Sequence, residues 1–226
     1  QVVKAAEKTG CRSISYTYTE PTVFFEFALE TARLANARGL RNVFVTNGYM
    51  TAEALDMIAP VLDAANVDLK AFTRAYYKDV CGAKLEHVQE TLRNMRAKGV
   101  FVEVTTLIVP GLNDGPAELK ALAEFLVKDL GAGTPWHISR FHPTYRLTDR
   151  PPTPVKTLSA AREIGLAAGL RHVYTGNVPG DQGENTFCPA CGATLIERWG
   201  FRVGKVRLKE GMCSQCGEGI EGVWFS

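Results

Sequence analysis

The segment SISYTYTEPTVFFEFALETARLA, residues 13–35, decides the fold because it joins a strand pattern directly to a helix pattern. Residues 13–18 are rich in Ile, Tyr and Thr, which favour strands. Residues 22–38 repeat a stripe at helical spacing. Pro21 suits the first turn of that helix, and Gly39 suits its carboxyl-terminal cap. The stripe consists of Phe24, Phe27, Ala28, Thr31, Leu34 and Ala35.

The same alternation continues to residue 177. Further strands are predicted at residues 42–46, 66–69, 100–109, 136–139 and 172–174. Helices are predicted at residues 2–8, from residue 51, and at residues 85–97, 118–130 and 155–168. Strands that alternate with helices of this length predict a parallel sheet with right-handed crossovers. The six strands favour an α/β fold with a partial (β/α)6 barrel, and an open doubly wound sheet is the alternative.

Composition narrows the function classes. The chain has 226 residues, 46% of them hydrophobic, and a net charge of +2 from 26 basic and 24 acidic residues. This balance argues against disorder and against bulk electrostatic binding to nucleic acid or to an anionic membrane. No apolar run reaches the roughly 20 residues of a membrane helix, and no secretory signal is present. No GxGxxG or Walker sequence follows a strand. Four of the six cysteines form two CxxC pairs, which point to metal and not to disulfides, so a protein of the reducing cytoplasm is predicted.

Polar side chains follow the predicted strands. In parallel barrels, ligands bind where strands end and the next loops begin. Each residue also has a plainer interpretation: a common turn for Asn47, an ion pair for Asp68 with Lys70, a solvent-facing position for Glu103, and a loop position for His142. Together they predict a polar cleft that suits a zwitterionic ligand with hydroxyl groups. The predicted binding set is Glu20, Asn47, Asp68, Lys70, Glu103 and His142.

Several segments, in order along the chain, resemble the radical S-adenosylmethionine (SAM) superfamily. The resemblance is closest to the pyruvate formate-lyase activating enzyme-like branch, and closer still to the radical SAM component of the AmmeMemoRadiSam system. Besides residues 13–35, the matching segments are FVTNGYMTAEAL (44–55), NVDLKAF (66–72), VEVTTLIVPGLND (102–114), PWHISRFHPTY (135–145), VYTGNVPG (173–180) and NTFCPACG (185–192).

The resemblance implies a [4Fe–4S] cluster on a CxxxCxxC loop that reduces SAM to a 5′-deoxyadenosyl radical. It implies that Asp68 and Lys70 contact the methionine part of SAM and that His142 lies near the adenine. Asn47 falls in the matching Thr-Asn-Gly turn, and Glu20 matches the acid of a Gly-Gly-Glu segment. The implied substrate is an unknown protein or small molecule, with Memo-like and AMMECR-like companion proteins. No catalytic residue is predicted.

The sequence also departs from the family pattern. Val45 stands where activating enzymes often carry an acid, and no CxxxCxxC occurs in the chain, where Cys11 stands alone. Cluster ligation requires closely placed thiolates. The motif belongs on a loop that would precede Gln1, so we interpret the chain as a truncated, inactive part of a radical SAM enzyme. An unpaired sheet edge that favours association is then expected.

Two other functions compete with this interpretation. The first is a catalytically inactive barrel fragment whose zinc-binding module serves structure or interaction. The second is a conventional barrel enzyme with Glu103 or Asp68 as general base, although no second catalytic partner can be named.

A cysteine quartet marks the carboxyl-terminal end. Residues 176–185 are typical of a linker, and two CxxC pairs follow, separated by 21 residues. Two such turns complete a tetrahedral zinc site, while four thiolates leave no open position for catalysis. Rubredoxin-like iron is the competing metal. The predicted ligands are Cys188, Cys191, Cys213 and Cys216, with Gly192 and Gly217 relieving the turns. We therefore divide the chain into a barrel, residues 1–177, and a linker with a zinc-ribbon-like β module, residues 178–226.

Between the pairs, residues 195–199 and 202–208 predict two strands about Gly200. Five cations gather there: Arg198, Arg202, Lys205, Arg207 and Lys209. Nucleic-acid binding is one interpretation, and the overall charge balance favours a solvated hairpin face.

Overall fold

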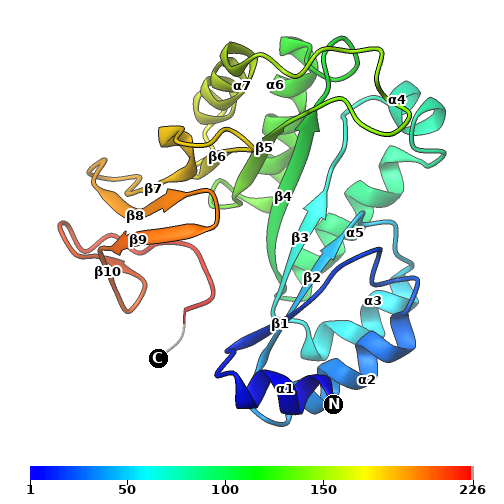
Figure 1. Ribbon diagram of the computed structural model, residues 1–226, viewed down its shortest axis with the longest axis vertical. Coiled ribbons are helices and arrows are strands. Elements are labelled where there is room, and N and C mark those ends of the chain that lie inside the picture. Colours follow the sequence, from blue (N-terminus) through cyan, green and yellow to red (C-terminus); the bar gives the residue numbers. More distant parts are fainter. Residues whose placement is uncertain (225–226) are drawn as a thin grey trace. The chain divides into compact units, whose positions relative to one another are not determined.

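The computed structural model describes residues 1–224 and contains the predicted alternation of strands and helices (Figure 1). Six strands form one sheet whose neighbours follow the order of the sequence. They are β1 Ser13–Tyr16, β2 Arg41–Thr46, β3 Ala64–Asp68, β4 Phe101–Ile108, β5 Trp136–Arg140 and β6 Val173–Gly176. The parallel pairing of β1 with β2, β2 with β3, β4 with β5 and β5 with β6 confirms the predicted α/β class.

Seven α-helices connect or precede these strands in the described residues. They are α1 Val2–Lys8, α2 Phe25–Asn36, α3 Ala52–Ile58, α4 Arg74–Asp79, α5 Leu85–Ala97, α6 Pro116–Phe125 and α7 Val155–Ala167. No described helix is long and apolar enough to cross a bilayer. The chain divides into two compact units, residues 1–69 with 84–103, and residues 70–83 with 104–226, whose last two residues lie outside the described part.

In the first unit, one buried amide ties several elements together. Asn42, at the start of β2, is fully buried, and its Nδ2 donates to Ala32 O at 3.0 Å and Val61 O at 2.9 Å. Its Oδ1 accepts from Tyr16 Oη at 3.0 Å. Burial raises the pKa of Tyr16 to about 12, so the phenol keeps its proton and remains a donor. A buried amide that is satisfied in this way fixes the position of α2 against β1 and β2.

The second unit is built around Trp136, the first residue of β5. The indole is fully buried, and its Nε1 donates to Thr106 Oγ1 at 3.0 Å. Helix α7 covers it at Gly165, where an added Cβ would lie 2.9 Å from Trp136 Cε3. Only glycine leaves room for the helix to approach this closely.

Some boundaries differ from the sequence predictions. Helix α2 begins at Phe25 rather than at residue 22, because Thr22 donates both its backbone N–H and its hydroxyl to the Glu20 carboxylate. The helix predicted at 118–130 consists of α6 and the π-helical turn η2, Leu126–Leu130. Helix α4 was not predicted, because a helix of six residues is too short to show helical periodicity in the sequence.

The cysteine-bearing tail folds into small antiparallel sheets. Strands β7 Thr186–Phe187, β8 Thr194–Trp199 and β9 Arg202–Val206 form one sheet, and β10 Leu208–Lys209 with β11 Met212–Cys213 forms another. The strand predicted at 202–208 is divided at Arg207, whose guanidinium donates to Thr194 O. The tail belongs to the same compact unit as β5 and β6. The division at residue 177 stays a prediction.

Candidate functional site

At the carboxyl end of β1, Glu20 is buried and bridges two loops of the first unit. Thr46 Oγ1 donates to its Oε1 at 2.6 Å, and the Asn47 N–H donates to its Oε2 at 2.7 Å. Charge-assisted hydrogen bonds of this kind offset the desolvation of a buried carboxylate. Glu20 therefore holds the ends of β1 and β2 together, and most of its acceptor capacity is used within the protein.

The Thr-Asn-Gly turn after β2 is shaped by its own side chains. Asn47 Oδ1 accepts from the Tyr49 N–H at 2.8 Å, which is an Asx-type turn. Gly48 has φ +71°, and an added Cβ would lie 2.7 Å from Val67 Cγ1. Glycine is thus required here for both conformation and space.

The two remaining acids of the predicted binding set, Asp68 and Glu103, occupy different positions along their strands. Asp68 is the last residue of β3 and is half-buried. Glu103 is also half-buried but is the third of the eight residues of β4. At ~3.3 Å per residue, Glu103 lies roughly 16 Å before the end of its strand. Asp68 therefore has the strand-end position that the sequence predicted, and Glu103 lies farther back.

In the second unit, the backbone of Lys70 is held from two sides. Its N–H donates to Tyr77 Oη at 3.1 Å, and its carbonyl accepts from Asn113 Nδ2 at 2.7 Å. Asn113 is buried, and its Oδ1 accepts from the Val109 N–H at 2.7 Å. Asn113 thus locks the segment of Lys70 to the loop that follows β4. Asn113 lies within the segment VPGLND, and no role was predicted for it from the sequence.

His142 follows β5 by two residues and is exposed. The chain beside it is fixed by Thr153, which is fully buried. Thr153 Oγ1 donates to Ile108 O at 2.5 Å and accepts from the Phe141 N–H at 3.1 Å. The ends of β4 and β5 are therefore joined through one hydroxyl, and the backbone next to His142 has a defined position.

The first unit also contains a pocket, between the segment that leads into α3 and helix α5. Its volume is about 240 Å³, and it is lined by Tyr49, His87 and Asn94 among others. Ligand pockets usually measure about 300–1,000 Å³. None of the six predicted binding residues lines it.

The four tail cysteines come together as predicted. Their sulfur atoms all lie within 4.8 Å of one another, with 3.5 Å between Cys188 and Cys216 and 3.8 Å between Cys191 and Cys213. A tetrahedral metal with bonds of ~2.3 Å holds its sulfurs about 3.8 Å apart. The donor set therefore fits one mononuclear metal ion.

Both turns that present these thiols have the same geometry. Gly192 donates its N–H to Cys188 O at 2.9 Å, and Gly217 donates to Cys213 O at 2.9 Å. The two glycines have φ +73° and +77°, a region that favours glycine. The predicted role of Gly192 and Gly217 in relieving the turns is confirmed.

A [4Fe–4S] cluster does not fit this donor set. Each thiolate of such a cluster binds a different iron, so its sulfurs lie farther apart than around a single ion. Cys11 and Cys81 belong to no group of three or more metal-binding side chains in the described residues. The described part of the chain therefore offers one metal site, and that site suits a single ion.

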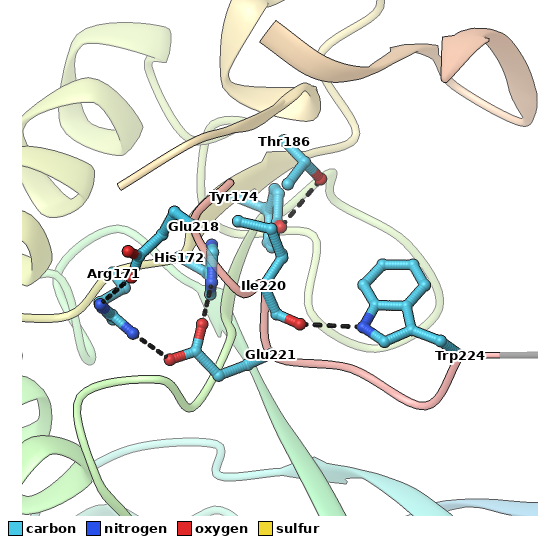
Figure 2. A network of polar contacts seen from close by, with 8 residues as sticks. All are labelled: Arg171, His172, Tyr174, Thr186, Glu218, Ile220, Glu221 and Trp224. Atoms are coloured by element: carbon cyan, nitrogen blue, oxygen red, sulfur yellow. Dashed lines mark hydrogen bonds and ion pairs between the residues drawn. The ribbon is translucent and has the colours of Figure 1, made fainter. Parts of the chain in front are cut away.

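The segment after the second cysteine pair is anchored to the start of β6 (Figure 2). Arg171 donates to Glu221 Oε1 at 2.6 Å and to Glu218 Oε1 at 2.8 Å, and His172 Nε2 lies 2.9 Å from Glu221 Oε2. Burial alone would raise the pKa of Glu221, but hydrogen bonds from His172 and Arg171 lower it below its ordinary value. The network joins the tail to the sheet of the second unit.

The sequence of the chain was compared with protein families and with curated proteins. The profile of the Radical SAM superfamily matches residues 1–126. An uncharacterized protein of Methanocaldococcus jannaschii is 48% identical over 98% of this chain and 66% of its own length. The isethionate sulfite-lyase activating enzyme of Nitratidesulfovibrio vulgaris is 31% identical over 52% of this chain and 40% of its own length. The chain thus spans about two thirds of one relative and less than half of the other.

Solved structures show the fold. A domain of pyruvate-formate lyase-activating enzyme from Bacteroides vulgatus has a TM-score of 0.64 at 16% identity, over 73% of this chain and 98% of that one. Streptococcus suis SuiB bound to S-adenosylmethionine has a TM-score of 0.63 at 12% identity, over 83% of this chain and 45% of that one. The sheet is therefore a partial barrel of the type that these proteins share.

Proposed function

The chain belongs to the radical SAM superfamily, and on that premise we propose that it forms the SAM-binding part of an enzyme that generates a 5′-deoxyadenosyl radical. One observation carries the proposal. The stretch that matches the family, residues 1–126, includes five of the six residues that the sequence assigned to SAM. These are Glu20, Asn47, Asp68, Lys70 and Glu103.

We assign different roles to these side chains. Asp68 and Lys70 contact the charged methionine part of SAM, because a carboxylate and an ammonium complement its amino and carboxylate groups. The backbone bonds of Lys70 to Tyr77 and Asn113 support this role, since they fix the base of a long side chain. Glu20 orients the loop that carries Asn47. His142 lies near the adenine. Glu103 receives no role at this end of the sheet, because it lies roughly 16 Å before the end of β4.

The described residues include no set of cysteines that would bind a [4Fe–4S] cluster. In the family, the cluster supplies the electron that cleaves SAM. The printed sequence contains no CxxxCxxC, and the one cysteine group of the described chain suits a single ion. No chemical step is therefore assigned to a cluster on this chain, and its ligands are placed on a segment that the chain does not include.

The substrate class is proposed from the relatives. Several of them are named as activating enzymes of other enzymes, among them isethionate sulfite-lyase and benzylsuccinate synthase. We propose that the whole protein likewise acts on a protein, in the cytoplasm, within an AmmeMemoRadiSam-type system with Memo-like and AMMECR-like companions. The tail, in this proposal, binds one structural Zn²⁺ through its four thiolates, with iron as the competing ion.

A second candidate function follows from the missing cluster ligands. The chain by itself would then be an inactive barrel fragment that carries a zinc-binding interaction module. The cysteine geometry and the exposed hairpin of the tail favour it.

Calorimetry with two related ligands tests the proposed SAM site. SAM and 5′-deoxyadenosine share the adenosine part, and only SAM carries the methionine part. If Asp68 and Lys70 recognise that part, the 226-residue chain binds SAM more tightly than 5′-deoxyadenosine. Equal affinities, or binding of neither ligand, would contradict the proposal.

A further inference from the structure

The outer strand of the tail hairpin is open to solvent along its whole length. Strand β9 pairs with β8 and with no other strand of the described chain. All five of its residues are exposed. Figure 1 shows β9 beside β8 in the orange part of the tail. An edge strand presents unpaired N–H and C=O groups that can pair with another chain.

Apolar side chains accompany this open edge. Val203 and Val206 are 61% and 56% exposed, Trp199 is 60% exposed, and Phe201 at the hairpin tip is fully exposed. Single exposed apolar residues are ordinary, but neighbouring ones indicate an interaction site. Val203 lies opposite Arg198 and Val206 opposite Ile196, so an irregularity in the pairing brings both valines to one face of the hairpin.

The hairpin also carries charge of one sign. Residues 198–209 contain five cations and no acid. Arg198 and Arg207 are used internally: Arg198 donates to Thr186 Oγ1, and Arg207 pairs with Glu197. The side chains of Arg202 and Lys205 form no hydrogen bond or ion pair with the other described residues of the chain. The unpaired positive charges of β9 therefore favour a partner with acidic side chains.

We propose that β9 is a docking edge for an extended, acidic segment of a partner protein, which adds to the sheet as a further strand. Strand addition gives affinity through backbone hydrogen bonds and specificity through alternate side chains. A segment that alternates Glu or Asp with β-branched residues would pair its acids with Arg202 and Lys205 and cover Val203 and Val206.

Two other occupants fit less well. A second copy of this chain would place Arg202 and Lys205 opposite like charges, which destabilises cross-strand pairs. Single-stranded RNA is held by aromatic faces on which bases stack. Within β9 itself the apolar side chains are two valines. The fully exposed Phe201 stands at the hairpin tip, outside the strand, and the Trp199 ring lies against the backbone at Gly204, 3.5 Å from where a Cβ would stand. The observations therefore favour a polypeptide.

The base of the hairpin packs into a small hydrophobic core, which fixes the position of β9. Leu195, next to the start of β8, is fully buried with Cys188, Cys213 and Ile220. The docking edge thus extends from a small core that includes two of the four thiols. This proposal does not depend on SAM chemistry.

Calorimetry on the zinc-loaded 226-residue chain tests the docking edge. The probe is a soluble peptide of alternating Glu and Val, compared with a Lys–Val peptide and an oligouridine of matched length. We expect the Glu–Val peptide alone to bind, with affinity that falls as salt rises. Hydrogen exchange should slow at backbone amides of β9 in the complex.

Charge reversal provides the matched comparison. The double variant Arg202→Glu and Lys205→Glu should bind the Glu–Val peptide with an affinity lower by about tenfold or more. Lys120→Glu, an exposed change on α6, should leave binding unchanged. Metal content and circular dichroism establish that both variants are folded. Tighter binding of oligouridine, association of the chain with itself through β9, peptide binding without protection of β9, or no peptide binding would each overturn the proposal.

Discussion

His172 Nε2 lies 2.9 Å from Glu221 Oε2, and the two residues are 49 positions apart in the sequence. The imidazole is 3% exposed, and the other oxygen of the same carboxylate accepts from Arg171. The carboxylate of one tail residue therefore forms hydrogen bonds with two side chains just before β6. The tail is attached to the sheet by specific hydrogen bonds and not by the linker alone.

Replacement of Glu221 by Ala should destabilise the protein. It leaves the buried His172 nitrogen without its partner, and an unsatisfied buried polar group lowers the free energy of unfolding by about 1–3 kcal/mol. Urea unfolding measures the effect. The exposed Glu124→Ala on α6 serves as the control, and an equal effect of the two variants would contradict the anchoring role.

Acid should weaken the same attachment. The pKa of Glu221 is lower in the folded protein, so its contribution is present above the unfolded-state pKa of about 4.3 and is lost as pH falls through the folded-state value. Stability measured by urea from about pH 7 to about pH 3 should therefore decline less steeply in Glu221→Gln than in the wild type. Parallel curves for the two proteins would show that Glu221 does not contribute.

Metal analysis should find about one zinc per chain. Cys213→Ser should lose it and unfold the tail, because structural zinc binding is worth roughly 10–16 kcal/mol in finger peptides. Cys81→Ser, outside the quartet, should keep it. Full zinc content and an unchanged melting curve in Cys213→Ser would rule out the site.

Lys70→Ala should weaken SAM binding by removing a cation near the SAM carboxylate. Hydrogen bonds to charged groups contribute about 1.5–3 kcal/mol, which corresponds to roughly 10- to 150-fold in affinity. Calorimetry compares this variant with Lys120→Ala on α6. Unchanged affinity in Lys70→Ala would remove Lys70 from the proposed site.

The 226-residue chain, supplied with iron and sulfide under anaerobic conditions, should form no 5′-deoxyadenosine from SAM, because it contains no CxxxCxxC. The chain extended by a segment that carries this motif should form it. Chromatography with mass detection measures the product. Product from the unextended chain, above a control without enzyme and retained in Cys188→Ser, would overturn the assignment of the cysteines.

Local signals explain which elements were predictable. The limits of α1 and α5 agree with the sequence predictions, and Gly39 and Gly99, just beyond α2 and α5, take positive φ values. The cysteine site was predictable because two thiols three positions apart need only a local turn. Helix α4 was not, because six residues show no clear period.

Roles that depend on tertiary contacts were not predictable. Glu20 was expected as a ligand, and its bonds to Thr46 and Asn47 join residues 26 and 27 positions away. Asn113 binds the carbonyl of Lys70, 43 positions away. Single-sequence patterns carry no signal for such pairs. Whether the six predicted residues bind SAM stays a prediction.

The buried indole of Trp136 has an optical consequence. The chain has three tryptophans, and they occupy three environments: Trp136 is fully buried, Trp199 stands at the hairpin tip, and Trp224 donates to Ile220 O in the tail. Because water shifts indole emission to the red, Trp136 should emit at the blue end of the spectrum and resist quenching by acrylamide. Its emission supplies an internal reference, so changes in the red part of the spectrum report on the tail while the barrel stays folded.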